Sequence, residues 1–556
     1  MLFLNVIFVL WLHLAHAASI VSRSNSYPLN SRSNTLGPKT DLIISNEVIS
    51  PDGFTRSTTL AGGTFPGPII AAQKGEHFEI NVVNRLTDGE MWKSTSVHWH
   101  GIDQNGTNYA DGASFVTQCP IAQNHSFLYS FEAQNQAGTY WYHSHYGTQQ
   151  CDGFRGALII YDPEDPLSYL YDVDDETTVI TLADWYHVVA PVLGHIIGTI
   201  GNSTLINGLG RYAGGPASEL AVVSLEYGKR YRLRLIAMSC HNNFAFSIDN
   251  HNLTVIEADG ELTEPLLVDS ITILAGQRYS AVLTMNQPVG NYWIRALPNP
   301  PGSTFKNGQS LAILRYKGAP VADPAVPTTK QTKSTMPLLE TNLHAFINPG
   351  APGVPGYGNA DINLKMVVNN TAGVFSINDA VFMPPTVPVL LQILSGARLA
   401  TDLLPLGSVY VLGANKVVEL TMTQTSTNPG GPHPIHLHGH SFDVVQSAGN
   451  SSFNYVNPVR RDVVSAGLAS QQMVIRWVTD NSGPWFLHCH IDWHLHAGFA
   501  VVFAESPSDT QKHLGPIPPA LDDLCPIYDS LTPAQIGAEN SYQEAQNIST
   551  ALYPPR

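Results

Sequence analysis

Histidine occupies alternate positions in four short segments, two toward each end of the chain. The pairs are His98-x-His100, His143-x-His145, His436-x-His438 and His488-x-His490. Residues i and i+2 of a β-strand point to the same face, so each pair presents two imidazoles side by side. Four such pairs are more than isolated core or surface histidines explain. If they converge, the fold brings distant parts of the chain together, and the eight imidazoles can hold about three metal ions.

A strand pattern occurs three times, in residues 75–82, 228–235 and 415–422. In the first segment Phe78, Ile80 and Val82 alternate with polar residues, and the other two segments alternate similarly. This period of two predicts half-buried β-strands, and its repetition predicts one β-sandwich per copy. The 45 Gly, 39 Pro and only 13% charged residues favour short strands joined by tight turns. The length of 556 residues makes the alternative, one large β protein, less favourable.

Two composition changes divide the chain into three predicted domains. One is the turn that starts at Asp162, and the other is the Pro-, Thr- and Lys-rich stretch 318–336. The resulting domains are 41–164, 165–330 and 331–556, the last with a C-terminal extension. Residues 18–40, rich in Ser and Asn, are expected to be flexible or removed by processing.

The N-terminus predicts export. Residues 2–14 are almost wholly apolar and Ala15-His16-Ala17 fits a cleavage site, so 1–17 is interpreted as a signal peptide. No later segment has about 18 consecutive apolar residues, which argues against a membrane partner. The net charge of −16 argues against nucleic acid, and we expect an extracellular monomer. Seven possible glycosylation sites agree with secretion: Asn105, Asn124, Asn202, Asn252, Asn369, Asn450 and Asn547.

Five cysteines in an exported chain leave one unpaired, and Cys489 has the context of a metal ligand. It points opposite to its neighbours His488 and His490, and His494 follows five residues later. Together with His433, these residues supply the one Cys and two His of a blue-copper electron-transfer site, which favours copper over zinc. The thiolate would face one copper while its neighbours face the other ions. Four one-electron coppers match the four electrons that convert dioxygen to water.

These motifs resemble those of the multicopper oxidases, most closely the fungal laccases. The likeness runs from Thr64-Phe-Pro-Gly-Pro68 to Cys525 and includes His98-Trp-His-Gly101 and Tyr140-Trp-Tyr-His-Ser-His145. The resemblance implies an all-β fold of three cupredoxin-like β-sandwiches with Greek-key topology. It also implies a secreted benzenediol:oxygen oxidoreductase that takes single electrons from phenols or aromatic amines and reduces dioxygen to water.

The resemblance also implies which residues hold the four copper ions. By motif position, the type 1 copper is bound by His433, Cys489 and His494, and the type 2 copper by His98 and His436. The type 3 pair takes the other six histidines, with His100, His143 and His490 on one ion and His145, His438 and His488 on the other. The three-copper cluster would then bridge the first and third domains.

Three further positions match family features. Phe499, ten residues after Cys489, stands where relatives can carry an axial Met, and Phe cannot coordinate a metal; we therefore predict a high-potential type 1 centre. This residue also argues against ascorbate-oxidase-like and bilirubin-oxidase-like relatives. The alternative is that Phe499 simply packs in the core, and it can do so while leaving the axial position without a ligand. Asp111 matches a proposed proton relay beside the type 2 copper, with a turn residue before Gly112 as the alternative. Asp492 resembles an acid near the type 3 ions.

The other four cysteines resemble the laccase disulfide pattern, Cys119 with Cys525 and Cys151 with Cys240. Sequence alone allows three pairings of four cysteines. Each implied disulfide closes a long loop and stabilises the fold by roughly 2–4 kcal/mol.

The donor pocket departs from the family. After the cysteine that matches Cys240, relatives typically carry an acid that binds the phenol and accepts its proton, and this chain has His241. An imidazole accepts a proton only while neutral, above its usual pKa of about 6.5. Either neutral phenols are oxidised best at higher pH than in acid-bearing relatives, or His241 faces away. We expect His494 to be the electron entry point, with His496, also unusual, at the pocket rim.

Two other functions stay open at this point. A ferroxidase-like metallo-oxidase would need acids around the type 1 site to bind Fe(II), and His241 in place of an acid disfavours it. A copper-binding glycoprotein without turnover would need only one site, and the complete histidine set opposes it. The natural donor is equally open: the resemblance suggests lignin degradation, but a pigment precursor, a plant phenol or a metal ion fits too.

Overall fold

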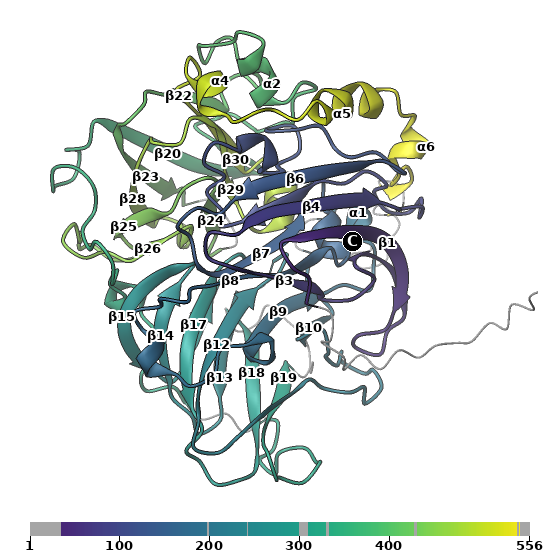
Figure 1. The fold of residues 1–556 in the computed structure, drawn as a ribbon, viewed down its shortest axis with the longest axis vertical. Coiled ribbons are helices and arrows are strands. Elements are labelled where there is room, and N and C mark those ends of the chain that lie inside the picture. The colour runs from purple at the N-terminus through teal and green to yellow at the C-terminus, as the bar shows by residue number, and fades with distance from the viewer. Residues whose placement is uncertain are drawn as a thin grey trace, which may run out of the picture.

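The computed structural model describes residues 35–196, 199–241, 243–299, 310–329, 333–426, 431–541 and 544. These residues form six β-sheets, two for each of three consecutive sandwiches (Figure 1). The predicted all-β fold with three sandwiches is therefore confirmed. The third sandwich (green in Figure 1) lies beside the first (purple to blue), and the second (teal) lies beneath both. The predicted signal peptide 1–17 and the sequon at Asn547 lie outside the described residues.

The first sandwich pairs a sheet of order β2-β1-β4-β6 with one of order β3-β8-β7-β5. Its strands are β1 (Lys39–Ile49), β2 (Arg56–Ala61), β3 (Gly67–Gln73), β4 (His77–Asn84), β5 (Val97–His100), β6 (Ser126–Glu132), β7 (Gly138–Ser144) and β8 (Arg155–Tyr161).

The second sandwich has sheets of order β10-β9-β12-β17-β14-β15 and β11-β19-β18-β13-β16. Its strands are β9 (Val179–Trp185), β10 (Ser203–Ile206), β11 (Val222–Leu225), β12 (Arg230–Ala237), β13 (Asn243–Ile248), β14 (Leu253–Ala258), β15 (Glu261–Val268), β16 (Ile271–Ile273), β17 (Arg278–Thr284), β18 (Asn291–Asn299) and β19 (Leu311–Tyr316).

The third sandwich has sheets of order β21-β20-β23-β28-β25-β26 and β22-β30-β29-β24-β27. Its strands are β20 (Ile362–Thr371), β21 (Val374–Ile377), β22 (Val409–Leu412), β23 (Val417–Gln424), β24 (Pro434–Leu437), β25 (Phe442–Gln446), β26 (Arg460–Arg461), β27 (Val463–Ser465), β28 (Gln472–Val478), β29 (Gly483–Cys489) and β30 (Ala500–Glu505).

Helices are short and lie between or after the strands. The α-helices are α1 (Ala190–Leu193), α2 (Val389–Leu394), α3 (Asp492–His496), α4 (Thr510–His513), α5 (Ala520–Asp529) and α6 (Pro533–Ile536). The 3-10 turns are η1 (Asn108–Ala110), η2 (Gln149–Asp152), η3 (Ser168–Leu170), η4 (Glu176–Thr178) and η5 (Glu340–Asn342). None of the helices in the described ranges is long and apolar enough to cross a membrane.

The three predicted strand repeats occupy the same position in the three sandwiches. They become β4, β12 and β23, and each lies between a parallel and an antiparallel neighbour. The parallel neighbours are β1, β9 and β20, and the antiparallel neighbours are β6, β17 and β28. The repeat in the sequence therefore marks one structural unit used three times.

The prediction that all three strands are half-buried is wrong for β12 and β23. Only β4 alternates buried and partly exposed residues. In β12, Arg232 and Arg234 are buried and paired with carboxylates, and Arg234 also donates to Thr139 Oγ1 of the first sandwich at 2.9 Å. In β23, Glu419 is buried against Arg476 at 2.8 Å. Neighbouring parts of the fold cover the polar faces, and burial is tolerated because the charges are paired.

The predicted domain boundaries at 164/165 and 330/331 stay predictions. They fall in the connections between β8 and β9 and between β19 and β20. At the N-terminus, the chain is already part of the fold before the end of the segment 18–40: Leu36 pairs with Ile70, and β1 begins at Lys39.

Two disulfides connect the domains. Cys119 is joined to Cys525 in α5, and Cys151 is joined to Cys240. Residues of α5 also pack into the core of the first sandwich, so the C-terminal segment (yellow in Figure 1) is held to that domain. Cys489 is free and buried. None of the six sequons in the described part of the chain has a buried asparagine.

Candidate metal centres

Strand pairing brings the histidine pairs together. In the first sandwich, β5 and β7 place His98 opposite His143, and in the third, β24 and β29 place His436 opposite His488. The second histidine of each pair lies two residues further along, at the strand end or just beyond it. All eight imidazoles are buried and meet between the first and third sandwiches. The histidine pairs therefore lie on strands and converge, as their period-two spacing predicts.

Imidazole nitrogens from different strands approach one another closely. Three of these distances cross from the first sandwich to the third. The distances are 3.3 Å for His98 Nε2 to His436 Nε2, 3.4 Å for His145 Nε2 to His488 Nε2, 3.2 Å for His100 Nδ1 to His490 Nε2, and 3.1 Å for His438 Nε2 to His488 Nε2.

In the facing pair of His98 and His436, the Nδ1 atoms carry the ring protons. His98 Nδ1 lies 2.8 Å from the carbonyl oxygen of Asp111, and His436 Nδ1 lies 2.9 Å from that of Asp462. Each Nδ1 therefore donates outward, and each neutral ring keeps a lone pair on Nε2. Two lone pairs then face each other at 3.3 Å. A cation between them removes this repulsion, so the arrangement fits a metal site.

Burial keeps these rings neutral. Burial first, and then neighbouring imidazoles, lower the pKa values of His100, His143, His436, His438 and His488 well below the usual value. Burial lowers the pKa values of His145 and His490 to about 3. Neutral imidazole is the form that binds metals. Several triplets of these side chains have ligand atoms within 4.8 Å of one another, as a shared ion requires.

A second centre lies on the other side of β29. Cys489 Sγ lies 3.9 Å from His433 Nδ1 and 3.6 Å from His494 Nδ1, and those two nitrogens are 3.1 Å apart. Burial raises the pKa of the Cys489 thiol, so a thiolate at this position needs a bound cation. Phe499 is buried and its ring lies 5.4 Å from that of His433, while it stacks on Phe375 at 5.0 Å. Its side chain offers no ligand atom.

Asp111 is not a surface turn residue. It is fully buried, its Oδ2 accepts from His438 Nδ1 at 2.9 Å, and its carbonyl oxygen accepts from His98 Nδ1. The other carboxylate oxygen, Oδ1, lies 3.2 Å from His98 Nδ1 but accepts no hydrogen bond. The structure therefore places a carboxylate with a spare acceptor directly behind two of the converging histidines.

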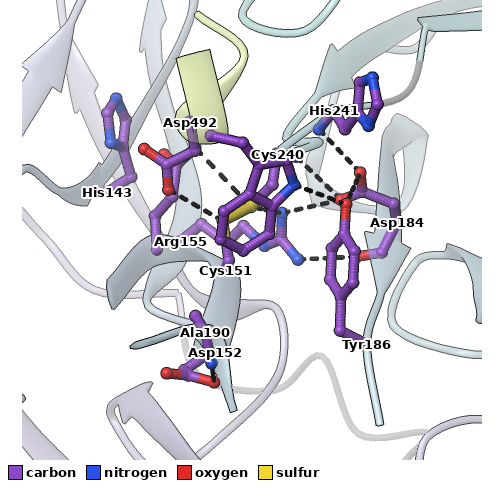
Figure 2. Close-up of a disulfide and its surroundings, with 12 residues drawn as sticks. His143, Cys151, Asp152, Arg155, Asp184, Tyr186, Ala190, Cys240, His241 and Asp492 are labelled. Carbon is purple, nitrogen blue, oxygen red and sulfur yellow. Dashed lines mark hydrogen bonds and ion pairs between the residues drawn. A yellow bond between two sulfur atoms is a disulfide. The ribbon is translucent and has the colours of Figure 1, made fainter. Parts of the chain in front are cut away.

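Asp492 lies beside the Cys151–Cys240 disulfide (Figure 2). Its Oδ2 is 2.8 Å from Cys151 Sγ, and its backbone N–H donates to the carbonyl oxygen of Cys240. Burial raises the pKa of Asp492 to about 8. A disulfide sulfur carries no hydrogen, so it cannot donate to this carboxyl group. This acid also lines a small cavity together with His143 and His490.

His241 lies on the far side of the same disulfide, next to the second centre. Asp184 accepts from its backbone N–H, as Figure 2 shows. His241 Nδ1 lies 2.8 Å from the carbonyl oxygen of Thr199, so this nitrogen is the donor and Nε2 keeps a lone pair. The ring centres of His241 and His494 are 5.9 Å apart. His496 is exposed nearby, with its ring 5.8 Å from that of His195.

Sequence reasoning missed Asp462 and its partner. Asp462 is buried, with Oδ1 3.3 Å from His100 Nε2 and its carbonyl oxygen bonded to His436. Its carboxylate pairs with Arg278 of the second sandwich at 2.6 Å. The run of charged residues from Arg460 to Asp462, between Val459 and Val463, is the only signal in the sequence that points to this position.

Three β-sandwiches with imidazole clusters between the outer two, and a Cys-His-His centre next to them, define a multi-metal redox protein. Family models of multicopper oxidase match residues 43–165, 176–319 and 382–509, one in each sandwich. Laccase-4 of Trametes villosa is 56% identical over 90% of this chain and 95% of its own length. The laccase of Pycnoporus cinnabarinus is 55% identical over 90% and 96%.

Solved structures give the same result. The laccase from Botrytis aclada superposes with a TM-score of 0.79 at 32% identity, covering 91% of this chain and 94% of its own. Fet3p, a multicopper oxidase that functions in iron import, superposes with a TM-score of 0.75 at 27% identity, covering 90% and 96%. The chain belongs to the multicopper oxidase family, and its sandwiches are cupredoxin-like. Membership of this family implies copper as the metal cofactor.

Copper removal should destabilise the protein, because the facing lone pairs lose the cation between them. An ion that binds only the folded chain, at about 1,000 times its Kd, adds about 4 kcal/mol per independent site. We expect calorimetry to show a lower Tm after chelation, restored by copper.

The variant His143→Ala should reduce this copper-dependent gain. His251 is a matched control, because it is buried and bonded to Tyr316 far from the centres. His251→Ala should lower the Tm with and without copper equally. An unchanged Tm on copper loading would contradict the assignment.

Proposed function

We propose that this protein is a secreted laccase-type multicopper oxidase that couples one-electron oxidation of phenols or aromatic amines to the reduction of dioxygen to water. The observation that carries the proposal is the placement of Cys489 and its two neighbours. The Cys489 thiol lies in the centre with His433 and His494, while His488 and His490 belong to the imidazole cluster.

The proposed cofactor is four copper ions. The type 1 ion belongs to His433, Cys489 and His494, and the type 2 ion to His98 and His436. The type 3 ions belong to the remaining six histidines, with His100, His143 and His490 on one and His145, His438 and His488 on the other. Bound copper supplies one-electron redox chemistry. Four donors each lose one electron and one proton, and one dioxygen takes up four of each to give two waters.

The chain supplies the electron route. The His494 ring is partly exposed, so a donor can contact its edge. From Cys489 the route to His488 or His490 runs through the covalent bonds of adjacent residues. Since β29 directs Cys489 to one face and its neighbours to the other, one strand links donor oxidation to oxygen reduction.

Two buried acids are proposed to handle protons. Asp111 has a spare carboxylate oxygen behind His98 and His438. Asp492 has a pKa raised to about 8 by burial and lines the cavity next to His143 and His490. An acid that is protonated near neutral pH can donate a proton and then be reprotonated. These are positions from which oxygen reduction can draw its four protons.

The donor site favours phenols over Fe(II). Burial first, then His433 and His241, lower the pKa of His494, and its ring packs on Phe375 at 4.5 Å. A cation-binding site would place carboxylates here, as the ferroxidase alternative requires. A copper glycoprotein without turnover does not explain the cluster of eight imidazoles. The net charge of −16 and the sequons suit a secreted monomer that binds neither nucleic acid nor membranes.

Oxygen uptake by the copper-loaded protein tests the proposal. We expect rapid uptake with a methoxyphenol, little with Fe(II), and no released peroxide. Uptake with Fe(II) alone would assign the protein to the metallo-oxidases. Four bound coppers with no uptake from either donor would leave the glycoprotein alternative.

Phe499→Met should lower the redox potential of the type 1 centre, because a thioether can supply the axial donor that Phe lacks. Redox titration of the blue absorption measures it. Phe503→Met is the control, since Phe503 is buried in β30, just after Phe499, but contacts Trp477 and Tyr410. An equal potential in wild type and Phe499→Met would show that the axial position does not set it.

His241→Asp should move the optimum for neutral phenols to lower pH. A carboxylate stays a base down to about pH 4, whereas an imidazole accepts a proton only when neutral. Rate profiles against pH with a phenol, and with a donor that has no phenolic proton, measure the shift. We expect the second profile to be unchanged.

His344→Asp is the matched control, because His344 Nδ1 also bonds a backbone carbonyl, that of Asn457, away from this site. Identical phenol profiles for wild type and His241→Asp would mean that another group accepts the proton.

A further inference from the structure

The second sandwich packs directly on the imidazole cluster, although the converging histidines come from the first and third. Gly276 lies in the turn between β16 and β17 with φ +86°. A Cβ at this position would lie 2.8 Å from His490 Cδ2 and 3.2 Å from His100 Cε1. Glycine is therefore required there, both for the backbone conformation and for the close approach. The turn therefore packs directly against His490 and His100, two of the proposed type 3 ligands.

Arg278, the first residue of β17, reaches from this turn into the other two sandwiches. Its Nη1 and Nη2 each lie 2.6 Å from one carboxylate oxygen of Asp462, and its Nε donates to the carbonyl oxygen of Thr139 at 3.0 Å. All three residues are buried. A Cβ on Gly101, which follows His100, would collide with this pair. The absence of a side chain at Gly101 thus leaves room for the bidentate Arg278–Asp462 ion pair, at the point where all three domains meet. We call this ion pair the clamp.

Asp462 acts on two proposed copper ligands in different ways. Its carbonyl oxygen accepts from His436 Nδ1 at 2.9 Å, and its side-chain Oδ1 lies 3.3 Å from His100 Nε2. His100 is oriented oppositely to the neighbouring rings, because its Nδ1 is the nitrogen that faces His490. The proton of His100 must therefore sit on Nε2, and Asp462 is the acceptor that holds it there.

We propose that Arg278 is a positioning residue for the oxygen-reducing cluster. It fixes the plane of the Asp462 carboxylate, and through it the tautomer and orientation of His100 and the place of His436. The second domain thereby sets the geometry of a metal site to which it gives no proposed ligand. This inference rests on the copper assignment proposed above.

The variant Arg278→Lys tests the clamp, because lysine keeps the charge but loses the planar fork. We expect copper analysis of the holoenzyme to show loss of cluster copper, with an affinity about 10–100-fold weaker. The type 2 paramagnetic resonance signal should change, and reoxidation by dioxygen should slow. The type 1 blue absorption, and its bleaching by a phenol, should remain as in wild type, because Arg278 does not touch that centre.

Arg295→Lys is the matched control. Arg295 is equally buried in the second sandwich and binds the two carboxylate oxygens of Asp249 at 2.7 and 2.8 Å, but this carboxylate contacts neither Arg278 nor the converging histidines. It should lose stability yet keep all cluster copper. A second variant, Asp462→Asn, should reproduce the cluster defect, because the amide cannot accept both nitrogens of the Arg278 fork.

Three results would overturn the inference. One is full cluster copper with an unaltered type 2 signal in Arg278→Lys. Another is the same copper loss in Arg295→Lys. The third is failure of both Arg278→Lys and Asp462→Asn to fold, which would make the clamp a requirement of folding instead. A wild-type protein that binds no copper at the histidines would refute the proposed function itself and is thus distinguishable.

Discussion

Eight buried imidazoles whose nitrogens face one another are the constraint on which this structure depends. In water each ring would be solvated, whereas here facing nitrogens lie 3.1 to 3.4 Å apart inside the protein. A cation between the facing nitrogens would stabilise this arrangement, which requires sheets from opposite parts of the chain to pack against one another. The Arg278–Asp462 ion pair and the Cys119–Cys525 disulfide are among the contacts that connect the sandwiches.

One strand explains how two different centres can communicate. In β29 successive side chains point to opposite faces, so Cys489 lies with His433 and His494 while His488 lies in the cluster. A helix would place these side chains at unequal angles and could not divide them so cleanly. The proposed electron route therefore requires the alternating spacing of His488, Cys489 and His490. It also explains why the thiol is the single unpaired cysteine in the described structure.

The sequence predicts those features that depend on local periodicity. The alternation in β4 and the histidine spacing are local, and both gave correct strands. The same reasoning failed for Arg232 and Arg234, because nothing near them in the sequence shows that the first sandwich covers their face. Asp462 was missed for a similar reason: its partner Arg278 is 184 residues away, and a lone aspartate carries no spacing signal. Contacts between domains are set by packing, which one sequence does not display.

The proposed donor site shows how a fixed backbone can carry a different side chain at one position. The backbone of His241 is fixed by Asp184, whose carboxylate also accepts from the backbone N–H of Cys240 and from Tyr186. The disulfide and these hydrogen bonds fix the backbone position of residue 241 and do not involve its side chain. Its side chain is therefore free to differ without disturbing the centre behind it. We propose that the His241 imidazole beside His494 alters which protonation state of a donor is favoured, while the proposed copper ligands, held by separate contacts, keep their geometry.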